Sequence, residues 1–360
     1  MKRTFAMLLC IVMALSLLAG CGGSGSGGSG NSDNGGNSGS GGTAGDTASG
    51  GSSDAQVKIQ LAHSDTESED GIHQKMSMLF ADYVKDLSGG SIEIEIVGNG
   101  QLGGERDLVE GMQLGSIEMA STANMVLSNF DPRFSVLDLP YLITNYETAY
   151  KVLDSDVIQG LLDSFAQESG VRVLAYGQGG FRQVIGNIPV HSLDDMKGMK
   201  VRVPESDIYI DTFNALGANP TPLAYTETFT ALQQGTVDAF EITPAVVLSA
   251  GFYEVCSDVS VINHLYSPNP FMISESLFQS LSEEQQGILQ EAAQKAAADQ
   301  RQWLEEGEAD TLAQLEEKGM HINYPEISAF QAAVDASGLY DSYRSTIGEE
   351  LFDSVQALCR

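Results

Sequence analysis

Two arginines, Arg182 and Arg202, have the clearest capacity for chemistry in this chain. They lie in the segment 177–204, and each is in or beside an apolar, strand-like run where a surface charge would gain little. The chain has only 18 Lys and Arg against 49 Asp and Glu. A guanidinium that is fixed by its surroundings binds a carboxylate through two parallel N–H···O bonds. The two arginines therefore predict a site for a small organic anion.

The local sequence favours a fixed position for each arginine. Arg202 lies between Val201 and Val203, so its side chain leaves the predicted strand on the opposite face from theirs. Arg182 follows a Gly-Gly-Phe sequence, and glycines let the backbone approach a ligand closely or simply make a turn. The alternative for Arg202 is a solvated strand arginine, and the alternative for Arg182 is a salt bridge near a hinge.

Three further polar residues are candidates for ligand contacts. His63 ends the first predicted strand and Asn124 follows a short buried strand, and ligands of α/β sheets bind at such strand ends. The alternative for His63 is a hydrogen-bonded loop histidine. Glu241 would repel a ligand carboxylate, but it could accept hydrogen bonds from ligand hydroxyls or pair with an arginine.

The N-terminus has the features of a processing signal. Two basic residues precede an apolar run, Phe5–Ala19, which is shorter than the ~20 apolar residues needed to span a bilayer. The run ends in Leu18–Cys21, which resembles a bacterial lipobox. That resemblance implies a signal peptide over residues 1–20, cleavage before Cys21 and acylation of this cysteine. A secretory signal with a chance cysteine is the alternative.

A low-complexity tether is predicted over residues 21–54. Beyond Cys21 it consists almost entirely of Gly, Ser, Asn, Asp, Thr and Ala, which cannot bury a core, so we expect it to be disordered. Such a chain has an end-to-end distance of about 30–35 Å. We expect the protein to be extracytoplasmic, anchored by lipid to the outer face of the cytoplasmic membrane or periplasmic.

Residues 55–360 are long enough for two domains or one interwoven two-lobed unit. The formal net charge of −31 excludes nucleic acid as a partner, because nucleic-acid binding needs a basic footprint. No metal-ligand spacing, CxxC pair or P-loop motif is present, so we expect no metal and no cofactor. Cys256 and Cys359 could pair, but a buried thiol and a free thiol in a mobile tail are favoured. We expect a monomer.

The chain opens with alternating strands and helices, the pattern of an α/β lobe with a largely parallel sheet. Strands are predicted at 57–62, 92–97, 116–122, 171–176, 200–203 and 237–242, with an extended segment at 220–223. Helices are predicted at 72–87, 104–114, 146–169, 207–216 and 226–234, with a short helix or turn at 193–198.

An unusually long helix is predicted from Ser282 to about Glu317. The segment has no proline, Ser282 and Gln285 form a capping box, and Ala, Gln, Glu and Leu dominate. Its length would be about 50 Å at 1.5 Å per residue, which is enough to run across two lobes. Gly307 is the position where it would bend or break.

Several segments together resemble the substrate-binding subunit of tripartite ATP-independent periplasmic (TRAP) transporters. They are 99–120, 137–154, the arginine segment up to 204, 212–241, 252–255 and the long helix after Ser282. The resemblance covers nearly all of residues 57–330. Each motif alone is weak, but the run of motifs in this order is highly specific.

The resemblance implies an α/β, two-lobed periplasmic-binding-protein-like fold with a long helix spanning both lobes. It implies that the chain crosses between lobes near 175–180 and 260–275. In that family an arginine in the strand before a Val-Pro turn binds the substrate carboxylate, and Arg202 matches it. Arg182 matches a second arginine. Tyr225 matches an aromatic residue that lines the pocket after an Asn-Pro-Thr-Pro segment.

The chain departs from the family pattern at one strand. Many members have Gln-Glu-Asn-Pro there, whereas Glu241 is flanked by Phe240 and Ile242 in this chain. The loss of two amides removes polar partners for a ligand hydroxyl or a second carboxylate. This departure mildly favours a less polar or monocarboxylate ligand.

We conclude from the sequence that this is a lipoprotein that binds an organic acid between two lobes and delivers it to TRAP membrane subunits. Its enclosed site would capture the carboxylate with arginine. No catalytic arrangement stands out, so we expect no enzyme activity. The alternatives are a secreted enzyme acting on a sugar acid, and a ligand-binding sensor that signals to a receptor.

Overall fold

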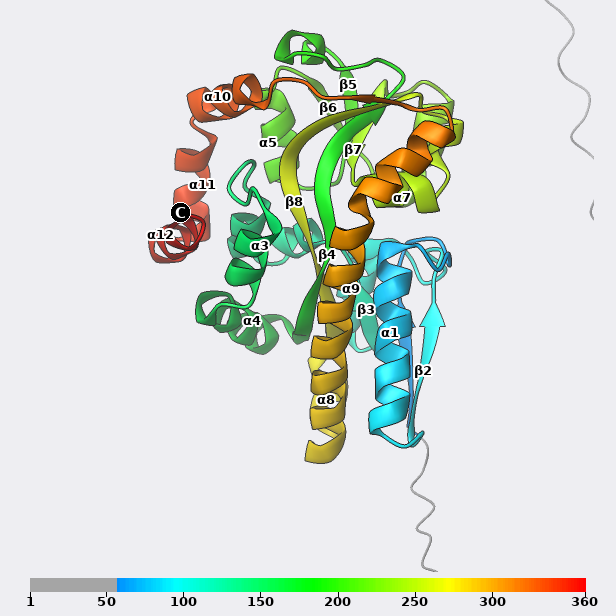
Figure 1. Cartoon of the computed structure of the whole chain (residues 1–360). Coiled ribbons are helices and arrows are strands. Elements are labelled where there is room, and N and C mark those ends of the chain that lie inside the picture. The colour runs from blue at the N-terminus through cyan, green and yellow to red at the C-terminus, as the bar shows by residue number, and fades with distance from the viewer. Residues whose placement is uncertain (1–56) are drawn as a thin grey trace, which may run out of the picture. The chain divides into compact units, whose positions relative to one another are not determined.

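The computed structural model describes residues 57–360 (Figure 1). The predicted signal peptide, the lipidation site at Cys21 and the predicted tether lie outside the described residues. Strands and helices alternate along most of the described part, which confirms the predicted α/β class.

The strands of residues 57–360 form one mixed sheet in the order β2-β1-β3-β8-β4-β7-β5-β6, with β9 paired to β8. The strands are β1 (Val57–Ala62), β2 (Ile92–Val97), β3 (Met119–Ser121), β4 (Val171–Gly186), β5 (Lys200–Val203), β6 (Asn219–Pro222), β7 (Ala239–Ile242), β8 (Asp258–Ser274) and β9 (His321–Asn323). The parallel sheet predicted for the N-terminal part holds for β1, β2 and β3, and β5, β6 and β7 repeat it. The antiparallel centre, where β8 pairs with β3 and β4 pairs with β7 and β8, was not predicted.

Two long strands, β4 and β8, run through the centre of the sheet and join its two parallel ends (Figure 1). The strand predicted at 171–176 continues to Gly186, and β8 was missed because Pro268 and Pro270 interrupt its pattern. The two strands pair antiparallel with three shifts of register. Gly180 lies at one shift with φ of +84°, a conformation that glycine adopts without strain.

The helices lie on both faces of this sheet and around its ends. They are α1 (Ile72–Leu87), α2 (Glu105–Leu114), α3 (Tyr146–Leu153), α4 (Asp156–Ser169), α5 (Asp207–Ala215), α6 (Tyr225–Gln233), α7 (Pro244–Ser249), α8 (Glu275–Ser280), α9 (Glu283–Glu317), α10 (Ile327–Ser337), α11 (Leu339–Ile347) and α12 (Glu349–Leu358). Short 3-10 helices occur at Asn124–Asn129 (η1), Pro132–Asp138 (η2), Leu193–Met196 (η3) and Phe252–Glu254 (η4).

Most predicted helices start and end within a residue or two of those observed, with one exception. The single helix predicted at 146–169 is two helices, α3 and α4. The break occurs because Ser155 acts as the N-cap of α4, its hydroxyl accepting a hydrogen bond from the backbone N–H of Ile158. The apolar spacing on both sides of Ser155 is helical, so spacing alone could not reveal the break.

The long helix α9 is continuous over Glu283–Glu317, as predicted, and Gly307 does not interrupt it. Its 35 residues span about 52 Å. The capping box is present, because the hydroxyl of Ser282 accepts from the N–H of Gln285 and the side chain of Gln285 accepts from the N–H of Ser282.

Helix α9 packs against both ends of the sheet. Its first half places Ala292, Ala293 and Ala296 in a hydrophobic cluster with α1 and β1. Its second half places Leu304 and Leu315 in a different cluster with α7 and β7. One helix therefore buries apolar surface in two separate cores, and it crosses the strands that join them.

The C-terminal helices pack back onto the middle of the chain. Helix α12 contacts α3 and α4, and its Phe352 and Val355 join the largest hydrophobic cluster of the described residues. The ammonium of Lys151 donates to the carbonyl of Leu358 at 2.8 Å. The expectation of a mobile tail around Cys359 is wrong, because this residue is half-buried against the same cluster.

A substitution of Gln300 on α9 tests how strongly the long helix is fixed to the central strands. Its side-chain amide is buried, donates to the carbonyl of Gln178 at 2.7 Å and accepts from the N–H of Gln178 at 2.9 Å. We predict that Gln300→Ala lowers the free energy of unfolding in urea by about 2–4 kcal/mol, because two buried backbone groups lose their partner. The control is Gln302→Ala, whose side chain contacts Glu306 on the exposed face of the same helix. Equal effects of the two substitutions would contradict the prediction.

Candidate functional site

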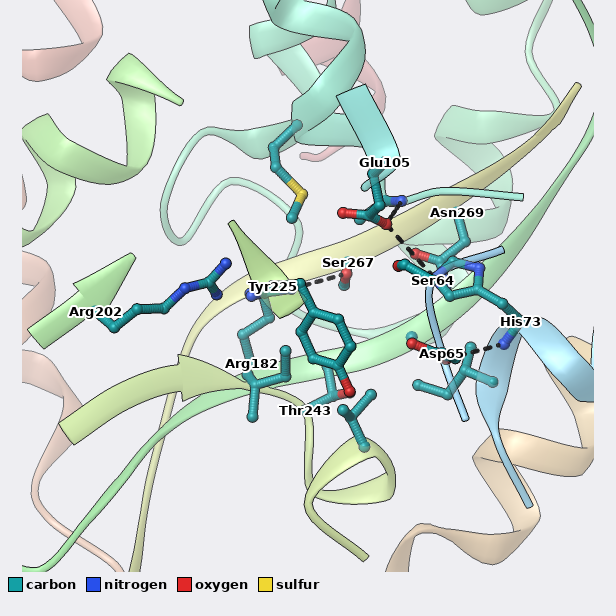
Figure 2. Close-up of a pocket in the computed structure, with 16 residues that line it drawn as sticks. Ser64, Asp65, His73, Glu105, Arg182, Arg202, Tyr225, Thr243, Ser267 and Asn269 are labelled. Atoms are coloured by element: carbon teal, nitrogen blue, oxygen red, sulfur yellow. Dashed lines mark hydrogen bonds and ion pairs between the residues drawn. The ribbon is translucent and has the colours of Figure 1, made fainter. Parts of the chain in front are cut away.

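A cavity of about 420 Å³ lies between the two parallel ends of the sheet (Figure 2). One wall comes from the segments that follow β1, from α1, from the start of α2 and from the segment after β3. The opposite wall comes from β4, β5, the start of α6 and the segment after β7. Both walls are therefore built at the carboxyl ends of parallel strands, where open α/β sheets bind their ligands.

Arg202, Arg182 and Tyr225 line this cavity together. In Figure 2 the three side chains lie on one side, and Asp65 and His73 lie on the other. The sequence prediction that two arginines and an aromatic residue meet at one site agrees with this arrangement. Their roles toward a ligand remain predictions.

The guanidinium of Arg202 is buried without a carboxylate. Its side chain is 2% exposed, and no ion pair within residues 57–360 includes it. Nε and Nη2 donate to the carbonyl oxygen of Leu223 at 3.0 and 2.6 Å, which occupies one edge of the fork. Burial lowers the pKa of Arg202 to about 10, so the group is still cationic at neutral pH. The edge formed by Nη1 and Nη2 remains for a carboxylate.

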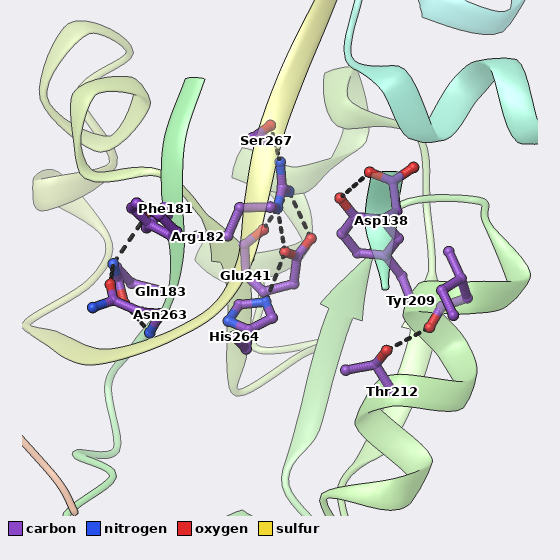
Figure 3. Close-up of polar contacts among 11 residues, drawn as sticks. Asp138, Phe181, Arg182, Gln183, Tyr209, Thr212, Glu241, Asn263, His264 and Ser267 are labelled. Carbon is purple, nitrogen blue, oxygen red and sulfur yellow. Dashed lines mark hydrogen bonds and ion pairs between the residues drawn. The ribbon is translucent and has the colours of Figure 1, made fainter. Parts of the chain in front are cut away.

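The guanidinium of Arg182, in contrast, is neutralised internally (Figure 3). Its Nη2 donates to Oε1 of Glu241 at 2.7 Å and to the backbone carbonyl of the same residue at 3.0 Å. His264 adds a contact from Nε2 to Oε2 of Glu241 at 3.3 Å. Burial alone lowers the pKa of Arg182, but the charge of Glu241 reverses this and the pKa is raised. Nη1 points toward Ser267, which also lines the cavity, at 3.4 Å.

Three of the predicted ligand residues lie behind the cavity wall. Glu241 is fully buried and holds Arg182, which is the pairing that the sequence left open. Asn124 donates to Asp138 at 2.7 Å and accepts from the hydroxyl of Tyr176 at 2.9 Å. His63 contacts Gln74 through Nε2 at 2.7 Å. None of the three is among the residues that line the cavity, because their side chains point into the protein.

The sequence reasoning missed the other polar residues that line the cavity. These residues are Ser64, Asp65, His73, Glu105, Thr243, Ser267 and Asn269. Thr243 Oγ1 and Asn269 Oδ1 are buried side-chain oxygens without a hydrogen-bond partner in the described part of the chain. Position after a parallel strand was the available signal for Asp65 and Thr243. Asn269 gave no signal, because it lies in the proline-interrupted strand that was not predicted.

Two carboxyl groups, the buried Asp65 and the partly buried Glu105, face the arginines across the cavity. Glu105 accepts a hydrogen bond from the N–H of Ala123 at 2.8 Å, and Asp65 accepts one from the N–H of His73 at 3.3 Å. Burial raises the pKa of both carboxyl groups, and it lowers the pKa of His73. The cavity thus has cations on one wall and hydrogen-bond acceptors on the other.

Comparison with known proteins identifies the family. Residues 61–345 match the sequence profile of the bacterial extracellular solute-binding proteins of family 7, DctP. The chain belongs to this family. A solute-binding protein of Roseobacter denitrificans is 32% identical over 311 residues, which cover 86% of this chain and 93% of that protein. The predicted resemblance is confirmed.

Solved structures of the family 7 fold agree with this assignment. A TRAP periplasmic solute-binding protein from Polaromonas, bound to D-erythronate, has a TM-score of 0.79 at 32% identity, over 84% of this chain and 98% of its own. The sugar acid binding protein of Advenella mimigardefordensis, in complex with galactonate, has a TM-score of 0.79 at 30% identity, over 84% and 97%. These similarities confirm the two-lobed fold.

Phe240 and Ile242, which stand where many family 7 members have amide side chains, differ in their relation to the cavity. Phe240 is fully buried, packs on Phe252 with 4.6 Å between ring centroids and does not line the cavity. Ile242 does line it. The argument for a less polar ligand therefore fails for Phe240, because that side chain contributes to the core, and it holds only for Ile242.

Other features of the family 7 protein bear on metals and membranes. Within residues 57–360, no group of three or more His, Cys, Asp or Glu has an arrangement that could hold a metal ion. Cys256 and Cys359 are both free thiols. Among the helices of the described residues, none combines the length and the apolar character needed to cross a bilayer.

Asp138 gives the site a measurable pH dependence. Burial raises the pKa of this carboxyl group from 3.8 to about 7 (Figure 3 shows it beside Tyr209). Between these values Asp138 binds up to one more proton in the folded protein than in the unfolded chain, so its contribution to the free energy of unfolding falls by up to about 1.4 kcal/mol per unit of rising pH. We predict that the stability of the parent protein relative to Asp138→Asn falls between pH 4.5 and 7 and levels off above pH 7. Urea unfolding across this range is the measurement, with exposed Asp341→Asn as control. A constant difference would contradict it.

Proposed function

We propose that this family 7 protein binds a hydroxylated monocarboxylate of the sugar-acid class and delivers it to the membrane subunits of a TRAP transporter. Arg202, Arg182 and Tyr225 contact the ligand, and Glu241, Asn124 and His63 support the wall behind them. The single observation that carries the proposal is the buried Arg202 guanidinium, which has no ion-pair partner within 4 Å among residues 57–360.

A ligand carboxylate is the group that best satisfies Arg202. A desolvated cation is costly unless an anion with good hydrogen-bond geometry accompanies it. Leu223 already occupies the Nε edge of the fork, so the carboxylate docks on the Nη1–Nη2 edge. Arg182 lines the same end of the cavity and offers Nη1 to the ligand, because Glu241 occupies only the Nε–Nη2 edge of its fork.

Hydroxyl groups on the ligand fit the rest of the cavity. Thr243 Oγ1 and Asn269 Oδ1 lack partners among the described residues, and the carboxyl groups of Asp65 and Glu105 are hydrogen-bond acceptors when ionised. A ligand hydroxyl donates to such acceptors, whereas a second ligand carboxylate would be repelled.

Similar proteins support this ligand class. The Polaromonas protein has D-erythronate and the Advenella protein has galactonate, and both compounds combine one carboxylate with several hydroxyls. The relatives are solute-binding proteins, so the function proposed is capture and delivery rather than catalysis. A ligand that contacts both walls stabilises the conformation in which the walls are close together. The membrane subunits recognise that conformation.

The proposed membrane attachment rests on Cys21 and on the predicted tether. Acylation of Cys21 would hold the binding domain at the outer face of the cytoplasmic membrane. Residues 22–54 would let it move about 30–35 Å from the anchor. Both segments lie outside the described residues, and the support is the lipobox-like sequence Leu18–Cys21.

The carboxylate role of Arg202 is tested by a conservative substitution. We predict that Arg202→Lys raises the Kd for D-galactonate at least about ten-fold, on the order of 1.4 kcal/mol, because lysine keeps the charge and loses the fork. Isothermal titration calorimetry gives the Kd values. The control is Arg344→Lys on α11, whose partner is Asp353. Unchanged affinity in Arg202→Lys would reject its role, and no binding by the parent protein to any of a panel of sugar acids would reject the ligand class.

The anchor is tested separately from the binding site. We predict that Cys21→Ala moves the protein from the membrane fraction to the soluble extracytoplasmic fraction, because acylation needs the cysteine thiol. Cell fractionation followed by immunoblotting measures this distribution. Cys359→Ala is the matched control and should stay with the membrane. Membrane retention of the Cys21→Ala protein would contradict the lipid anchor.

A further inference from the structure

Hydrogen bonds join the two walls at one rim of the cavity. Ser128 and Asn129 end the 3-10 helix η1, which also carries the cavity residue Met125. Glu205 and Ser206 follow β5, which carries Arg202. The hydroxyl oxygens of Ser128 and Ser206 are 3.3 Å apart, and Nδ2 of Asn129 donates to the carbonyl oxygen of Glu205 at 3.0 Å. We refer to Ser128, Asn129, Glu205 and Ser206 as the rim clasp.

The direction of the serine pair follows from the other bonds. The hydroxyl of Ser128 donates its single hydrogen to the carbonyl oxygen of Met125 at 2.7 Å. It can therefore only accept from Ser206, whose hydroxyl must be the donor. Ser206 is 2% exposed, so water does not compete freely for this bond.

The hydroxyl of Ser206 does not make the hydrogen bond that is usual for a serine at this position of a helix. It is the N-cap of α5, and serine at an N-cap usually accepts a hydrogen bond from the first turn. No such side-chain bond exists for Ser206, whereas Ser155 and Ser282 make it at α4 and α9. The Ser206 hydroxyl thus serves the contact between the walls instead of its own helix.

We propose that the rim clasp holds the two walls together and sets how long a ligand stays bound. Ser128 and Ser206 line neither this cavity nor the adjacent pocket that shares Arg202 with it, so the two serines are positioning residues that act through the closed conformation. Asn129 and Glu205 line the adjacent pocket. The role in ligand retention rests on the proposed function, while the role in holding the walls does not.

Ligand dissociation rates test the proposal with D-galactonate as the probe. We expect Ser206→Ala, Ser128→Ala and Asn129→Ala each to raise the dissociation rate about three- to ten-fold, the range that one net hydrogen bond provides, with little change in the association rate. The control is Ser342→Ala, because Ser342 makes the same kind of bond within its own turn, to Leu339 at 2.7 Å, without a contact across the cavity.

A double substitution tests the serine pair itself. The rates of Ser128→Ala/Ser206→Ala should equal those of the single variants, because either change alone breaks the bond. Multiplied effects in the double variant, or rates in all variants equal to the control, would overturn the proposal. The melting temperature of each variant is recorded, so that a change in the ligand dissociation rate can be distinguished from a loss of stability.

A ligand-free measurement keeps the clasp testable if galactonate does not bind. Spin labels at Arg106→Cys and Glu227→Cys, in a Cys359→Ser background of the mature protein, report the distance across the mouth of the cavity by pulsed electron resonance. We expect Ser206→Ala to shift the distances toward longer values. Unchanged distances would overturn the clasp, whereas absent galactonate binding with shifted distances would reject only the ligand class.

Discussion

The main electrostatic constraint in this structure is the burial of two guanidinium groups, only one of which has an ion-pair partner within the described part of the chain. Arg182 has its carboxylate inside the protein, from Glu241, and Arg202 has only a carbonyl oxygen. Both side chains are nearly inaccessible to water. A buried cation without an ion-pair partner is unfavourable, so a bound anion would stabilise Arg202 more than Arg182. The acidic composition of the rest of the chain makes this positive region local.

Two long strands and one long helix join the two walls of the cavity. Strands β4 and β8 pass through both halves of the sheet, and α9 packs its alanine-rich first half and its leucine-containing second half in separate cores. Few segments therefore connect the walls. The Gln300 amide fixes α9 to the central strand at Gln178, close to a shift of register.

The sequence predicted more of the scaffold than of the site. Helices and parallel strands could be predicted because their apolar spacing is regular, and α9 because its cap and composition are strong. Strand β8 was not, since Pro268 and Pro270 mask its pairing, and the break at Ser155 lies inside one helical pattern. Arg182 and Arg202 were identifiable as cations in apolar surroundings. The acceptors Thr243 and Asn269 were not, because only the fold shows that their oxygens lack partners.

Helix α12 also governs when the molecule can fold. Its side chains complete the core around α3 and α4, and the bond from Lys151 to Leu358 joins residues 207 positions apart. Contacts of such separation form slowly, because a long loop must close first. A chain that leaves the ribosome or threads through a secretion pore N-terminus first has an incomplete core until this helix follows.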